Sequence, residues 1–174
     1  MKYSREQLIE RIRQAARSIG FPEAVAVAQL ARESANFRAD VVYGPFVGRD
    51  GERGVAQFLP GTWARFGQGM HQTAYDPDAS LAAWAAYTSY LMRLFNGDLT
   101  KVLQGYNGGE GHVTNPERYG PVSSRARQYA SEVLRSAGQM DTEGTGVTTM
   151  PFNLPIWAIV GGVALLAFVV LLDD

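Results

Sequence analysis

The sequence predicts a mainly α-helical domain followed by a single C-terminal transmembrane helix. Apolar residues recur at helical spacing in several segments before residue 138, which is typical of amphipathic helices packed around a core. Residues 156–172 form an unbroken run of apolar residues and glycine, just long enough to cross a bilayer core. A Gly- and Thr-rich stretch separates the two. We therefore divide the chain into a domain at 1–137, a linker at 138–154 and a transmembrane helix at 155–172.

The composition limits the chemistry that is available. The 174 residues are 46% hydrophobic, enough for one compact domain with its own core. There is no cysteine, which excludes disulfides, a thiol nucleophile and a cysteine-ligated metal. His71 and His112 lack the spacing of metal ligands, so we expect surface histidines, no metal site and no cofactor.

The charges are distributed unevenly. The 16 basic residues all lie at or before Arg135, and the same part of the chain holds 13 acidic residues, a net charge of +3. The rest of the chain has four acidic residues and no basic one. A mildly basic domain is compatible with an anionic polymer or a membrane surface, and equally with ordinary solvation. We expect no nucleic-acid partner.

Two helices are expected at the start of the chain. Ser4 and Gln7 have the spacing of a capping box for the first helix, and Gly20 stops it. Pro22 suits the first turn of the second, which is predicted to run to about Ala35 and is largely apolar.

Glu33 stands in the last turn of this apolar second helix. The negative end of the helix dipole and burial both disfavour the carboxylate, so both should raise the pKa of Glu33. A carboxyl group that keeps its proton near neutral pH can act as a general acid. The alternative is an exposed charge at a frayed helix end.

Loops and four more helices should follow. Residues 36–70 are rich in glycine and read as a long loop, with short strands possible at 41–43 and 55–58 and a brief helix near 61–63. Asp76 and Pro77 have the form of an N-cap and first helical residue. The helix that they begin has the clearest apolar stripe in the chain, at Leu81, Trp84, Ala85, Thr88, Leu91, Met92 and Phe95.

The remaining helices are shorter or later in the chain. Asp98 is expected to cap a helix from Leu99 to about Tyr106, and residues 107–111 are expected to form a flexible loop. A final amphipathic helix should span 124–137.

Four local patterns occur in one order along residues 20–135. They are Glu33-Ser34, then Gly54-Val55-Ala56-Gln57 with Pro60-Gly61-Thr62-Trp63 behind it, then Tyr75-Asp76-Pro77, and last Gly105-Tyr106-Asn107-Gly108-Gly109. This order resembles the soluble lytic transglycosylase family, which has Glu-Ser, Gly-Leu-Met-Gln and Ala-Tyr-Asn-Ala-Gly at similar spacing. The resemblance implies a lysozyme-like fold of the goose type.

The resemblance also implies roles for the matching residues. Glu33 would be the sole catalytic acid and then base, and Ser34 would help to hold the substrate. Gln57 would hydrogen-bond the glycan or its peptide stem. Tyr106 would point at the Glu33 carboxyl and Asn107 would shape that loop. Tyr129 falls where the family often has an aromatic residue in its final helix.

The sequence departs from the family pattern at three places. The Leu-Met pair is Val55-Ala56, the alanine before the tyrosine is Gly105, and the Glu-Thr that often precedes the last-helix tyrosine is Arg125-Ala126. Beyond the motifs, Asn36-Phe37 and the tyrosines at 43, 75 and 106 are candidates to line a sugar cleft.

The implied substrate is the glycan strand of peptidoglycan. No second carboxylate stands in a context as apolar as that of Glu33, because Asp50 and Glu52 lie in the predicted loop. One acid suffices if the muramic acid 6-hydroxyl is the nucleophile, which gives a 1,6-anhydro product. A hydrolytic lysozyme is the alternative if Asp50 or Glu52 positions a water. A membrane-anchored module that only binds glycan is the other.

The cellular setting follows from the tail. The N-terminus is polar and lacks an apolar run of the signal-peptide type, whereas residues 155–172 can insert into a lipid bilayer. We expect a phage virion protein that opens the cell wall as the phage enters, acting in the periplasm, or else a host envelope enzyme. Virion or envelope proteins are then possible partners. No Lys or Arg flanks the apolar run, so the membrane orientation is not predicted.

Overall fold

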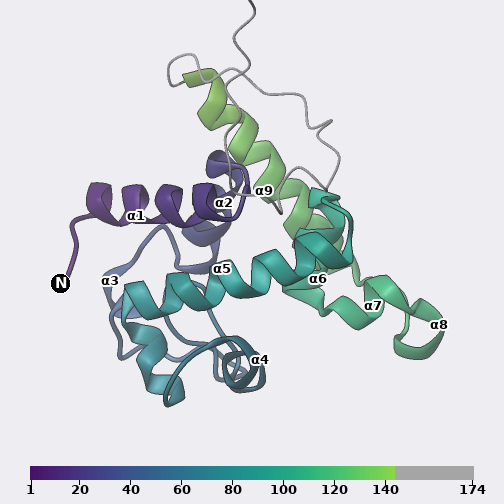
Figure 1. Cartoon of the computed structure of the whole chain (residues 1–174), viewed down its shortest axis with the longest axis horizontal. Coiled ribbons are helices and arrows are strands. Elements are labelled where there is room, and N and C mark those ends of the chain that lie inside the picture. Colours follow the sequence, from purple (N-terminus) through teal and green to yellow (C-terminus); the bar gives the residue numbers. More distant parts are fainter. Residues whose placement is uncertain (144–174) are drawn as a thin grey trace, which may run out of the picture.

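The computed structural model describes residues 1–143, and these form a helical domain (Figure 1). The helices are α1 (Arg5–Ser18), α2 (Glu23–Glu33), α3 (Ala39–Val42), α4 (Pro60–Phe66), the 3-10 helix η1 (His71–Tyr75), α5 (Pro77–Leu94), α6 (Leu99–Gly108), α7 (Glu110–Thr114), α8 (Pro116–Tyr119) and α9 (Ser124–Glu143). The mainly α-helical fold class is confirmed for this part of the chain. The predicted transmembrane helix at 155–172 lies outside the described residues.

Two of the predicted helix starts are confirmed in detail. The Ser4 hydroxyl accepts a hydrogen bond from the Gln7 amide and the Gln7 side chain returns one to the Ser4 amide, so the capping box of α1 is complete. At the start of α5, the Asp76 side chain accepts hydrogen bonds from the amides of residues 78 and 79. These local hydrogen bonds satisfy amide groups that helix geometry leaves unpaired.

The long helix α5 runs through the middle of the domain, with α1 packed on it (Figure 1). Its Trp84 is fully buried, with its ring edge-on to Phe21 at 5.8 Å between centroids. The Trp84 indole donates a 3.3 Å hydrogen bond to the Gln29 side chain on α2. The core therefore ties α2 to α5, and α2 carries Glu33 at its last position.

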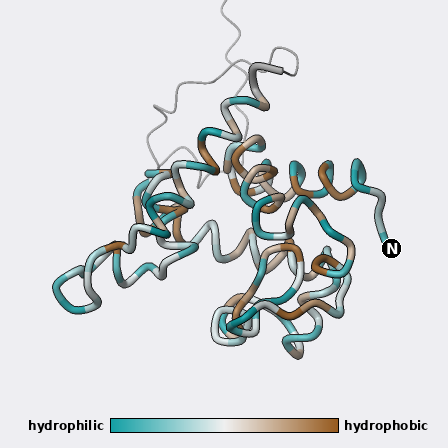
Figure 2. Tube along the Cα trace, turned by 180° about the vertical axis from the view of Figure 1, so that it is seen from behind, coloured by the Kyte–Doolittle hydropathy of each residue, from teal (hydrophilic) through white to brown (hydrophobic). Residues whose placement is uncertain are grey.

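Helix α9 packs against both α2 and α6. The approach of α6 is close because Gly108 has no side chain: a Cβ atom there would lie 2.9 Å from the Ala126 Cβ on α9. Beyond α6, the short helices α7 and α8 project to one side (Figure 1), and this projection is largely hydrophilic (Figure 2). The packing brings together the end of α2, the end of α6 and the start of α9.

The two short strands expected in the loop region are not formed. Residues 39–42 make the single helical turn α3, in which Val41 and Val42 are both buried. Residues 53–58 make turns with one isolated antiparallel bridge between Arg53 and Phe58. A strand needs a hydrogen-bonded partner along its length, and the turns around this bridge leave no room for one.

Two other boundaries differ from the expectation. Residues 107 and 108 continue α6 and residues 110–114 form α7, so the predicted flexible loop at 107–111 is wrong. The chain turns at Gly109, whose φ of 91° is favourable for glycine. Helix α9 continues to Glu143, past the domain boundary predicted at residue 137. Within residues 1–143, no helix is both long enough and apolar enough to cross a membrane.

Candidate active site

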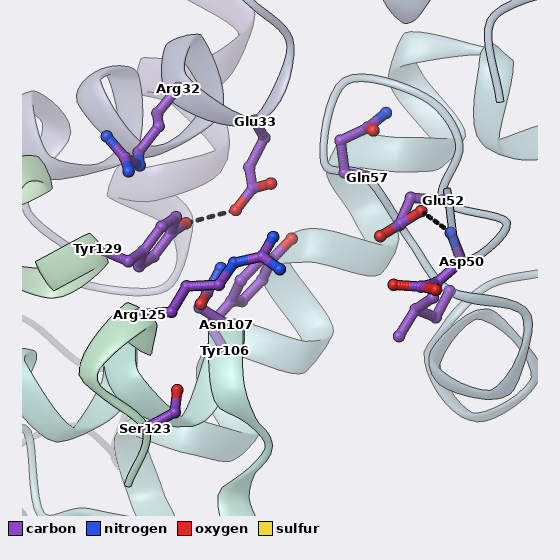
Figure 3. A pocket seen from close by; sticks show the side chains of 11 residues that line it. Arg32, Glu33, Asp50, Glu52, Gln57, Tyr106, Asn107, Ser123, Arg125 and Tyr129 are labelled. Atoms are coloured by element: carbon purple, nitrogen blue, oxygen red, sulfur yellow. Dashed lines mark hydrogen bonds between the residues drawn. The ribbon is translucent and has the colours of Figure 1, made fainter. Parts of the chain in front are cut away.

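The Glu33 carboxyl opens onto a pocket of about 530 Å³ (Figure 3). The walls come from the end of α2, the end of α6, the start of α9 and the loop before α4. The lining residues are Arg32, Glu33, Asp50, Glu52, Gln57, Leu59, Tyr106, Asn107, Ser123, Arg125 and Tyr129. Of the six predicted site residues, the fold brings five into this pocket and leaves Ser34 out.

Glu33 has the electrostatic setting of an acid that is protonated near neutral pH. Burial of the carboxyl group raises its pKa from the ordinary value of 4.5 to about 7. A hydrogen bond from Tyr129 and the positive charges of Arg32 and Arg125 act in the opposite direction, while the negative charge of Glu52 adds to the increase. The raised pKa predicted from the sequence is thus confirmed, and burial is its main cause.

Tyr129 makes the hydrogen bond to the acid. Its hydroxyl donates to the Glu33 Oε1 atom at 2.5 Å (Figure 3). The sequence prediction gave this role to Tyr106, whose hydroxyl instead donates to the carbonyl oxygen of Ala56 at 2.7 Å. That part of the prediction is wrong because the α9 residue, and not the α6 residue, has its hydroxyl aimed at the end of α2.

The position of Tyr129 is fixed from several sides. Its side chain is buried, the Arg32 guanidinium lies over its ring at 5.3 Å, and Arg32 itself is ion-paired with Glu132. Burial and the nearby negative charge of Glu33 raise the pKa of Tyr129 well above 10. Tyr129 therefore keeps its proton and serves as a permanent donor to Glu33.

Tyr106 holds the opposite side of the acid pocket in place. Its hydrogen bond to Ala56 ties α6 to the residue that precedes Gln57. Its ring lies 5.3 Å from that of Tyr87, which in turn donates a hydrogen bond to Glu110. Burial raises the pKa of Tyr106, so this contact does not titrate in the physiological range. Tyr106 positions the loop and contributes a wall to the pocket.

Gln57 stands in an unusual backbone conformation at the pocket wall. Its φ is 49°, which a non-glycine residue rarely adopts, and its side-chain amide donates a 2.8 Å hydrogen bond to the Gly54 carbonyl oxygen. The preceding turn needs a glycine, because a Cβ atom at Gly54 would lie 1.8 Å from the Ala74 carbonyl oxygen. The strained turn places Gln57 across the pocket from Glu33 (Figure 3).

Ser34 does not reach the pocket. Its side chain is fully buried, and its hydroxyl donates to the Leu30 carbonyl oxygen at 2.7 Å. The Ser34 hydroxyl oxygen in turn accepts a 3.1 Å hydrogen bond from the Phe37 amide. The geometry does not support the predicted contact with substrate. Ser34 instead closes the C-terminal turn of α2, which fixes the direction of Glu33.

Two carboxylates stand on the wall facing Glu33. Asp50 and Glu52 both line the pocket, and the Glu52 carboxylate accepts a 2.8 Å hydrogen bond from the Asp50 amide (Figure 3). The sequence analysis placed both in a solvated loop and considered them only as residues that could position a water in the hydrolytic alternative. The negative charge of Glu52 adds to the raised pKa of Glu33.

Residues 10–128 match the sequence profile of a family described as the transglycosylase SLT domain. The chain belongs to this family. Its fold is similar to that in the X-ray structure of an inactive glutamate-to-glutamine mutant of the lytic transglycosylase Slt from Pseudomonas aeruginosa. The TM-score is 0.60 at 24% sequence identity, and the match covers 81% of this chain and 25% of the other. A search of curated proteins gave no match.

Six pocket residues of this SLT domain were not among the predicted site residues: Arg32, Asp50, Glu52, Leu59, Ser123 and Arg125. Arg32 and Arg125 bring positive charge to the side of the pocket that holds Glu33, and Ser123 precedes α9 on the same side. The sequence contained one signal for Arg125: it precedes Tyr129 by four residues in a helix, so the two share a face. Arg32, which stands next to Glu33 at the end of α2, has no comparable signal.

Two aromatic candidates lie elsewhere in the SLT domain. The Tyr43 hydroxyl bonds with the backbone of Tyr3, and the Tyr75 hydroxyl donates to the Phe46 carbonyl oxygen at 2.6 Å. Neither lines the pocket, so the expectation that they line a sugar cleft is not supported by the geometry.

The described part of the chain offers no metal centre. Within residues 1–143 there is no group of three or more potential metal ligands. His71 and His112 are both partly buried and contact backbone carbonyl oxygens, those of Phe58 at 2.6 Å and Gly120 at 3.0 Å. Both imidazoles therefore help to hold the neighbouring backbone segment in place through these contacts.

Proposed function

We propose that this domain is a peptidoglycan lytic transglycosylase that cleaves the β-1,4 bond between N-acetylmuramic acid and N-acetylglucosamine. The observation that carries the proposal is Glu33, a half-buried residue whose carboxyl has a pKa of about 7 and accepts a hydrogen bond from Tyr129 at the wall of an open pocket. A general acid works best when its pKa is close to the working pH. Membership of the SLT family supports the same activity.

One residue is sufficient for both proton transfers. Protonated Glu33 gives its proton to the glycosidic oxygen as the bond to the muramic acid C1 breaks, so the 4-hydroxyl of N-acetylglucosamine leaves. The muramic acid 6-hydroxyl then attacks C1, and its proton returns to the Glu33 carboxylate. The product is a 1,6-anhydromuramic acid end, no water is consumed, and Glu33 is regenerated in its protonated form.

Two of the other pocket residues have defined tasks in this scheme. Tyr129 donates to one carboxyl oxygen and so leaves the other to face the substrate. Gln57 and Asn107 stand on opposite walls and offer amide groups to the sugar hydroxyl and acetamido groups. A module that only binds glycan has no need of an acid with a raised pKa, which makes the binding-module alternative the weaker one.

A hydrolytic muramidase is the second candidate, and Glu52 is the observation that favours it. Its carboxylate faces the pocket across from Glu33 (Figure 3), the arrangement in which a second carboxylate can activate water. Mass spectrometry of the fragments released from purified peptidoglycan distinguishes the two. Anhydro ends support the transglycosylase. Reducing ends support the muramidase, and no fragments between about pH 4 and 8 would leave the binding module.

The cellular setting is also part of the proposal. We expect the segment at 155–172, which is outside the described residues, to anchor the enzyme in a lipid bilayer. The setting that we favour is a phage virion whose membrane-held enzyme opens the cell wall when the phage enters; a host envelope is the other. Fractionation tests both points. The full chain should require detergent for extraction whereas residues 1–143 should not, and particle preparations should contain the protein.

A further inference from the structure

The charges in the pocket are separated between its two sides. Arg32 and Arg125 lie on the side formed by α2 and α9, while Asp50 and Glu52 lie on the facing loop (Figure 3). Glu33 stands on the positive side. An extended sugar chain that crosses the pocket therefore meets two different electrostatic environments, and any charged group on it has a preferred side.

The two arginines differ in what already occupies them. Arg32 is ion-paired with Glu132, and its guanidinium lies over the Tyr129 ring. These two contacts already occupy the guanidinium group and help to position Tyr129. Arg125 is exposed, points into the pocket (Figure 3), and makes no ion pair with any carboxylate in the described part of the chain. From this position its positive charge lowers the pKa of Glu33.

The substrate has one kind of anion to offer. Glycan hydroxyl and acetamido groups are neutral, whereas muramic acid carries a lactyl carboxyl group, either free or joined to a stem peptide that has carboxylates of its own. A guanidinium group binds a carboxylate with two parallel hydrogen bonds, a geometry that lysine or an amide cannot reproduce. Arg125 thus has the chemistry to distinguish a muramic acid residue from an N-acetylglucosamine residue.

Resting on the function proposed above, we propose that Arg125 binds a muramic acid carboxylate and thereby sets the direction in which the glycan strand crosses the pocket. The muramic acid lies on the α9 side, next to Glu33, and the neutral N-acetylglucosamine lies toward Asp50 and Glu52. In the reverse direction the substrate carboxylate would face two carboxylates. The charge separation therefore presents the correct one of the two alternating β-1,4 bonds to Glu33.

Binding to a cleavage-deficient Glu33→Gln full-length chain tests this assignment. Three glycan preparations are compared: intact strands, strands stripped of peptide by an amidase so that lactyl carboxylates are free, and stripped strands whose carboxylates have been converted to amides. We expect the carboxylate-bearing strands to bind about tenfold more tightly than the amidated ones. Adding Arg125→Gln should abolish that preference. Adding Arg135→Gln, the same charge change on an exposed residue further along α9, should preserve it.

The outcomes separate the two sources of the carboxylate. A preference for stripped over amidated strands identifies the lactyl group, and a preference confined to intact strands identifies the stem peptide; both support the assignment. Equal binding of all three preparations, no binding of any, or a preference that survives Arg125→Gln overturns it. Failure of the proposed function is a different result, the absence of anhydro ends from the wild-type protein.

Discussion

The Tyr129 hydroxyl and the Glu33 carboxyl, 96 positions apart in the chain, form a hydrogen bond of 2.5 Å. The contact exists because α9 packs against α2 and places its buried tyrosine at the C-terminal end of that helix. The bond both orients the acid and lowers its pKa from the value that burial alone would give. Orientation and proton affinity of the acid are therefore controlled by the same hydroxyl group.

Replacing Tyr129 by phenylalanine should separate these two effects. Glu33 acts in its protonated form, so activity should fall as the pH rises through its pKa of about 7. In Tyr129→Phe that pKa rises, and the descending limb of the pH profile should move to higher pH. The maximal rate should fall about tenfold, because a hydrogen bond to an ionisable group contributes about 1.5–3 kcal/mol. The pH dependence of fragment release from peptidoglycan measures both.

Tyr106→Phe is the matched control for that experiment. It removes the same atom from the other tyrosine of the pocket, but that hydroxyl donates to the Ala56 carbonyl oxygen. We expect the descending limb to stay in place and the free energy of unfolding to fall by about 1–3 kcal/mol, the cost of a buried carbonyl left unpaired. A limb that moves in Tyr106→Phe and not in Tyr129→Phe would contradict the roles assigned here.

Glu52→Gln should move the same limb in the opposite direction. The negative charge of Glu52 raises the pKa of Glu33, so its removal lowers that pKa and the descending limb shifts to lower pH. If the enzyme is a transglycosylase, the proportion of anhydro ends should be unchanged, since Glu52 then handles no water. A wild-type protein that releases reducing ends and a variant that does not would identify Glu52 as the residue that positions the water.

The raised pKa of Glu33 also predicts how stability depends on pH. Because the folded-state pKa of about 7 is above the ordinary 4.5, the contribution to stability is complete below about pH 4.5 and is lost as the pH rises through 7. Glu33→Gln removes this dependence. We expect it to be more stable than the wild type at pH 8 by roughly 3 kcal/mol, and by much less at pH 4.5. Urea unfolding of both proteins at the two pH values gives the comparison; equal differences at both would contradict it.

Gly54 should be intolerant of substitution. A Cβ atom there would overlap the Ala74 carbonyl oxygen at 1.8 Å, and the φ of 75° is itself unfavourable for alanine. Gly54→Ala should lose more than about 3 kcal/mol of unfolding free energy and displace Gln57 from the pocket. Gly61→Ala in α4 is the control, because a Cβ atom there meets nothing within 4 Å. It should be neutral or slightly stabilising by thermal unfolding.

Local signals in the sequence were sufficient for much of the fold and part of the pocket. The caps at Ser4 and Asp76 depend on neighbouring residues only, so they could be predicted and are confirmed. The motifs also led to Gln57 and Tyr106, which line the pocket with Glu33. Which hydroxyl reaches the acid could not be predicted in this way, because Tyr106 and Tyr129 lie on different helices and their directions depend on how α6 and α9 pack.

The direction of the two pocket carboxylates Asp50 and Glu52 was not predicted, for a related reason. Asp50 and Glu52 lie in a glycine-rich segment, where no periodicity predicts which way a side chain points. Their direction depends on turns such as the one in which the Glu52 carboxylate accepts the Asp50 amide. Likewise, the short strands expected at 41–43 and 55–58 did not form, because the apolar residues there are buried within a helical turn and within turns.

The most direct test of the central claim, that one acid performs the cleavage, is the activity of Glu33→Gln on purified peptidoglycan. The variant should release fewer fragments than the wild type by about 10²–10⁴-fold, while it pulls down with the glycan as well as the wild type does. The wild-type fragments should end in 1,6-anhydromuramic acid. Release of anhydro fragments by Glu33→Gln at the wild-type rate would show that another residue supplies the proton, and would contradict the account.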